Sequence, residues 1–104
     1  WYNTEISKWS DGLGLTLVCH SSGTNSNQDW TYPESNVKYF SSQEIIDGIM
    51  NYELEQPEGL NGFILLLHIG TDERRTDKLY YRLDEIISEL KNRGYNFTLL
   101  SDTI

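Results

Sequence analysis

His68 and Asp29 are the two residues of this chain whose types and positions suit proton transfer. His68 ends the most apolar run of the sequence, Phe63–His68, which lies between two glycines. An imidazole gives or takes a proton near neutral pH, and a carboxylate bound to its other ring nitrogen fixes its orientation. His68 is therefore a candidate general acid and Asp29 its candidate partner. The alternative is a structural histidine and a turn or cap aspartate.

Helical and extended patterns alternate along the chain and predict an α/β fold. The apolar runs predict strands over Leu13–Cys19, Phe63–Ile69 and Tyr95–Leu100. Strands that alternate with helices run parallel, joined by right-handed crossovers. The expected architecture is three parallel strands alternating with three helices. The loops after the first two strands then share one sheet edge, which would bring Asp29 to His68 although 39 positions separate them.

The three helices are predicted from apolar spacing and from end signals. Tyr2, Ile6 and Trp9 suit a short helix that ends before Gly12. The second helix begins with the capping box Ser41-Ser42-Gln43-Glu44 and stops at Pro57 and Gly59. The third has Thr76 or Asp77 as its cap and Gly94 just past its end. Its apolar stripe is Leu79, Leu83, Ile86, Ile87 and Leu90.

Length and charge restrict the class of protein. A chain of 104 residues makes a single domain or subdomain over residues 1–104. Its start at Trp1, with Met50 as the only methionine, suggests a piece of a longer protein. Sixteen acidic against eight basic residues give a net charge of −8, which disfavours nucleic acid and anionic membranes and is compatible with a neutral sugar. Two histidines and one cysteine make a self-contained zinc site improbable.

Other polar residues are predicted to be structural. Arg74 and Arg75 are expected in a solvated loop with a local ion pair, the alternative being contact with an anionic ligand. His20, at a predicted strand end, is expected to be structural. Cys19 is expected in the core, because it lies in an apolar run.

The residues from Gly62 to the end resemble a known family. The run GFILLLHIG, then Arg75-Thr76, then LDEIISELKNRGYNFTLLSD, is similar to the C-terminal end of the polysaccharide deacetylases, carbohydrate esterase family four. Members of this family, also called the chitooligosaccharide deacetylase homology domain, are metal-dependent hydrolases that remove acetyl groups from chitin, peptidoglycan or xylan. The resemblance implies the C-terminal part of a distorted (β/α) barrel.

The resemblance also implies roles for individual residues. Leu66-Leu67-His68 matches the Leu-x-His motif, in which the histidine is the general acid and the leucine lines the acetyl pocket. Asp29-Trp30 matches an Asp-Trp motif, in which the aspartate tunes the histidine and the tryptophan walls the pocket. The fuller motif has a second aspartate where this chain has Ser26. The opening residues 1–3 resemble those that follow another family motif.

The family's base aspartate and metal ligands belong to motifs that this sequence lacks. We therefore expect the chain alone to bind no catalytic metal and to be inactive, with a divalent metal such as zinc in the full-length parent. The expected partners are a poly- or oligosaccharide and the upstream part of the same chain, in an extracellular or periplasmic protein. Two alternatives remain open: a non-catalytic glycan-binding module that uses side chains at 24–32, and a structural subdomain of a larger glycan-degrading enzyme.

Overall fold

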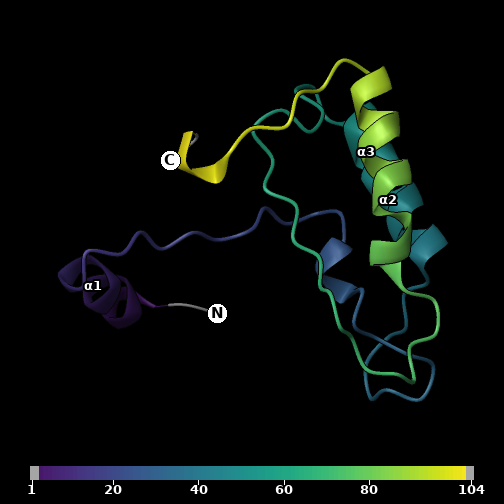
Figure 1. The fold of residues 1–104 in the computed structure, drawn as a ribbon, viewed down its shortest axis with the longest axis horizontal. Helices are drawn as coiled ribbons and strands as arrows, with labels where there is room; N and C mark the ends of the chain where they lie inside the picture. Colours follow the sequence, from purple (N-terminus) through teal and green to yellow (C-terminus); the bar gives the residue numbers. More distant parts are fainter. Residues whose placement is uncertain (1–2, 103–104) are drawn as a thin grey trace.

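Three α-helices form the longer regular elements of the computed structural model, which describes residues 3–102 (Figure 1). They are α1 over Thr4–Gly12, α2 over Ser42–Glu55 and α3 over Leu83–Asn92. Short 3-10 turns lie at Ser26–Gln28, Leu79–Arg82 and Leu100–Asp102. Trp1 and Tyr2, which enter the family resemblance, lie outside the described residues, and Tyr2 is also part of the first helix prediction.

The predicted parallel sheet is wrong, because residues 3–102 contain no β-strand. The three apolar runs are extended, but a strand also needs a ladder of hydrogen bonds with a neighbour. The first and second of these regions are linked by a backbone bond from Ser21 N, two residues past the first run, to Ile64 O at 2.9 Å. The α/β class and the barrel architecture implied by the resemblance are therefore corrected to a chain whose described regular elements are helices, joined by long extended connections.

The first and third runs are also exposed rather than buried. Leu13 is 74% and Leu15 62% exposed, and Leu99 is 70% exposed. Cys19 is exposed as well, so the prediction that it lies in the core is wrong. The run that ends at His68 is half-buried along its length rather than buried on both faces.

Local end signals place the helices largely where the sequence predicts them. Ser41 caps α2, its Oγ accepting from Glu44 N at 3.1 Å, while the Glu44 carboxylate accepts from Ser41 N. Gly94 follows α3 with a φ of +95°, and Tyr95 N donates back to Leu90 O, so the helix ends in a Schellman motif. The predicted cap of the third helix is wrong. Asp77 instead accepts from Ser42 N, at the beginning of α2.

A small apolar core lies between α2 and α3. It consists of Ile45, Ile46, Ile49, Leu60, Leu79, Ile86 and Leu90. The α1 helix buries no residue and lies away from this body (Figure 1). The radius of gyration is 15.5 Å, above the roughly 13 Å of a compact domain of this length. Among the described residues, none of the helices has the length and apolarity needed to cross a membrane.

Candidate functional site

The candidate site is built where the polar loop of residues 21–29 packs along the apolar run 63–68. Alternate backbone groups of an extended chain face the same side. Ile64 N donates to Ser21 Oγ at 3.0 Å, and Ser26 Oγ donates to Leu66 O at 2.6 Å. Two residues further along, His68 meets Asp29. The loop thus takes the place of a neighbouring strand, and its side chains set the register between Asp29 and His68.

Asp29 accepts two hydrogen bonds from His68. The backbone N of His68 lies 2.6 Å from Asp29 Oδ2, and the ring Nδ1 lies 2.6 Å from Oδ1. The predicted contact between the two residues is therefore present, although a loop and not a sheet edge creates it. An ionised carboxylate only accepts, so Nδ1 carries the proton of this bond. Asp29 is 1% exposed, whereas 43% of the His68 side chain is exposed.

This arrangement fixes the chemistry open to His68. Because Nδ1 is engaged by the buried carboxylate, Nε2 is the ring nitrogen available to a bound molecule. The backbone bond to the same carboxylate fixes the main chain next to the ring, which holds the imidazole in one orientation. Such a histidine can donate a proton from Nε2 when doubly protonated and accept one there when neutral.

The other predicted site residues lie around this pair without joining it. Trp30 follows Asp29 in the chain and is 39% exposed, with no ring contact to another described residue. Leu66 is half-buried, and its carbonyl holds Ser26. His20 is half-buried and has no hydrogen-bond partner among residues 3–102. The roles of Leu66 and Trp30 as pocket walls stay predictions.

Arg75 is a residue of this region whose position the sequence did not reveal. It is 1% exposed, so its assignment to a solvated loop is wrong. Its guanidinium donates to the carbonyl oxygens of Thr31, Phe40 and Asp77 at 2.7, 2.7 and 2.8 Å. Thr31 and Ser26 are also buried, at 0% and 2% exposure. The composition of a Ser/Thr-rich loop predicts exposure to solvent. Its burial here results from packing on the apolar run, which the local sequence does not indicate.

Arg74, in contrast, forms the predicted local ion pair. Its guanidinium contacts both carboxylate oxygens of Asp72, at 3.0 and 2.7 Å, and lies over the ring of Tyr32. The hydrogen bonds from Arg74 lower the pKa of the Asp72 carboxyl, and the same carboxylate raises the pKa of Arg74. This pair is at the surface and leaves Arg74 engaged with protein groups.

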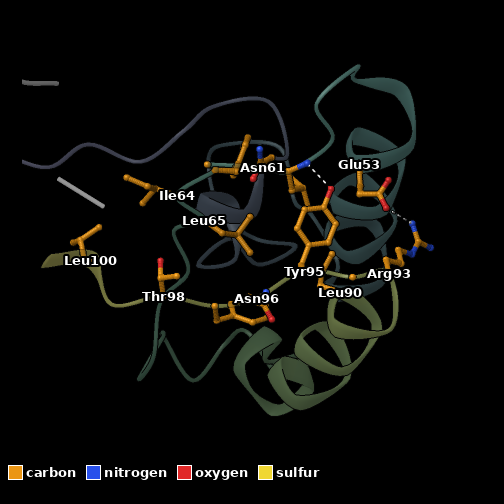
Figure 2. Close-up of a pocket in the computed structure, with 15 residues that line it drawn as sticks. Glu53, Asn61, Ile64, Leu65, Leu90, Arg93, Tyr95, Asn96, Thr98 and Leu100 are labelled. Carbon is orange, nitrogen blue, oxygen red and sulfur yellow. Dashed lines mark hydrogen bonds and ion pairs between the residues drawn. The ribbon is translucent and has the colours of Figure 1, made fainter. Parts of the chain in front are cut away.

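A hollow of the described chain lies apart from His68. It measures about 750 Å³ and opens between residues 60–65 and 93–100 (Figure 2). Apolar side chains such as Ile64, Leu65 and Leu90 line it, and the Tyr95 hydroxyl within it accepts from Leu60 N at 2.9 Å. Because it contains no group suited to proton transfer comparable to the Asp29–His68 pair, its size does not make it the candidate site.

The residues present do not fit a catalytic metal ion. Within residues 3–102, no three His, Cys, Asp or Glu side chains lie close enough together to share a metal. The divalent metal that the family resemblance implies stays a prediction for the full-length parent.

Comparison of the chain with models of protein families, with curated proteins and with solved structures finds no match. The case for a function accordingly depends on the residues of the site and on the sequence resemblance.

Proposed function

We propose that this chain is the acid-bearing portion of a polysaccharide deacetylase, which removes acetyl groups from a polysaccharide such as xylan, chitin or peptidoglycan. The observation that supports the proposal most is the hydrogen bond between Asp29 and His68 Nδ1, which leaves Nε2 without a hydrogen-bond partner among residues 3–102 on a side chain that is 43% exposed. The Leu-x-His and Asp-Trp motifs support the same assignment.

In this reaction His68 acts in the second half of the hydrolysis. Once water has added to the acetyl carbonyl and given one proton to the base aspartate that the family resemblance implies in the full-length parent, the anionic tetrahedral intermediate breaks its bond to the sugar oxygen or nitrogen. That leaving atom takes the proton from His68 Nε2, and the electron pair of the broken bond remains on it. The products are acetic acid and the free hydroxyl or amine, and the imidazole is left neutral, with its remaining proton on Nδ1 and hydrogen-bonded to Asp29.

Kinetics on the natural full-length polypeptide test this role. In the proposed mechanism His68→Ala lowers acetate release from acetylated xylan or chitooligosaccharide about 10²–10⁴-fold, the usual worth of a general acid. KM changes little, since the proton is transferred in the transition state. His20→Ala is the matched control, and it leaves turnover near the wild-type value. Near-unchanged turnover in His68→Ala would remove His68 from the mechanism.

Glycan binding without chemistry is the second candidate function, and the exposed indole of Trp30 favours it. Aromatic faces pack against the apolar faces of sugar rings. Trp30→Ala and His68→Ala separate the candidates. A binding module would lose affinity for the oligosaccharide in Trp30→Ala, and neither the natural polypeptide nor its His68→Ala variant would release acetate.

A further inference from the structure

Arg75 has the largest side chain among the fully buried residues that the structure describes. It forms no ion pair with a carboxylate among residues 3–102. Its bonds go to three carbonyl oxygens and, at 3.3 Å, to Ser42 Oγ, while its guanidinium lies beside the ring of Tyr39. Burying a charged group costs desolvation free energy. A planar guanidinium that matches this many acceptors therefore serves to fix the geometry of the residues it contacts.

The acceptors of Arg75 connect it to the site in a closed ring of contacts. From His68 the chain runs seven residues to Arg75, whose Nη1 bonds Thr31 O. Thr31 is two residues after Asp29, and Asp29 returns to His68 through the bond at 2.6 Å. The segment 68–75 therefore holds the 29–31 turn at both of its ends. One attachment alone would leave the turn free to swing about it.

Thr31 transmits this constraint to the turn. Its Oγ1 accepts from Phe40 N at 3.0 Å and donates to Gln28 O at 2.8 Å, and its backbone N also donates to Gln28 O. The carbonyl of Phe40 is itself bound to Arg75. Residues 28–31 belong to no helix of their own beyond a 3-10 turn, so these contacts decide where the Asp29 carboxylate lies.

We propose that Arg75 is a positioning residue, which holds the 28–31 turn so that Asp29 selects the Nδ1–H form of His68. Its importance for catalysis rests on the proposed function, but its effect on the imidazole does not. The guanidinium touches neither His68 nor the carboxylate of Asp29. It acts through Thr31.

Imidazole ¹⁵N–¹H correlation spectra of this chain, without substrate, test the proposal. We expect Arg75→Lys, which keeps the charge and loses the planar fork, to lower the Nδ1–H fraction of neutral His68 and to speed exchange of that proton about tenfold, since a weakened charge-assisted hydrogen bond is worth at least that factor. Thr31→Val removes the hydroxyl relay at nearly constant volume and is expected to act in the same direction. It serves as the second variant if Arg75→Lys fails to fold.

Two controls separate positioning from loss of stability. The spectrum of His20 reports on the same sample and is expected to stay unchanged. Arg93→Lys, which alters the Arg93 pairs with Glu89 and Glu53 on α3, is expected to leave His68 as in wild type. A folded Arg75→Lys or Thr31→Val with the wild-type tautomer and exchange rate of His68 would overturn the proposal. That result would leave the general-acid role, tested by acetate release, standing on its own.

Discussion

The two hydrogen bonds that Asp29 accepts make Asp29→Asn a sharp test of the site. Asn has one acceptor oxygen and one donor amide in place of two acceptor oxygens. The backbone N of His68 can only donate, so the Asn oxygen must face it, and the amide group then faces the ring Nδ1. Two donors would meet there unless the imidazole moves its proton to Nε2. We expect that move, and hence a neutral His68 with the opposite tautomer to wild type.

The cost in stability follows from the same count of bonds. Both bonds can be kept after the tautomer change, but each loses its charged acceptor in a site where Asp29 is 1% exposed, so the free energy of unfolding is expected to fall by about 1.5–3 kcal/mol. Urea denaturation measures that fall, and imidazole ¹⁵N spectra at alkaline pH report the tautomer. Asp11→Asn, at an exposed position without a side-chain partner among the described residues, is the control and should stay within about 0.5 kcal/mol. Unchanged stability with a retained Nδ1–H form would refute the assigned geometry.

Two further predictions concern the rest of the chain. Ser41→Ala removes the α2 cap and should lower the free energy of unfolding by about 1 kcal/mol, whereas Ser88→Ala, at an exposed position inside α3, should not; equal effects in urea denaturation would contradict the capping geometry. Asp72→Asn should reduce the amount by which the free energy of unfolding falls when the pH is lowered. The pKa of Asp72 is lowered in the folded chain by Arg74, so its contribution is present above the ordinary value of 3.8 and is lost as pH falls further. Denaturation midpoints measured between about pH 5 and about pH 2 should therefore fall less steeply in Asp72→Asn, and parallel curves would contradict the ion pair.

Features that depend on neighbours in sequence were predictable. The capping box at Ser41 and the Schellman ending at Gly94 involve bonds across three to five positions, so residue types alone indicate them. The strands were not predictable in the same way. An apolar run such as Phe63–His68 favours extended backbone, but whether it joins a sheet depends on which distant segment meets its backbone groups. Here the side chains of Ser21, Ser26 and Asp29 meet them.

One contact of the site was predicted, but the physical reason given for it differs from the one that the structure shows. The pairing of Asp29 with His68 was expected from a shared sheet edge, and it is instead produced by the packed loop. Arg75 and Asp77 were missed because a charged residue in a polar stretch has the same local signature whether it is solvated or buried. Their partners, Thr31 and Ser42, lie more than thirty positions away and carry no signal in the local pattern.

The most direct test of this account is the state of His68 in the wild-type chain. Imidazole ¹⁵N–¹H spectra at alkaline pH should show a predominantly Nδ1–H ring with a slowly exchanging Nδ1 proton and no proton on Nε2, while His20 shows the ordinary mixture of a ring without a partner. A His68 ring that is predominantly protonated at Nε2, or that exchanges its Nδ1 proton as fast as His20, would contradict the account.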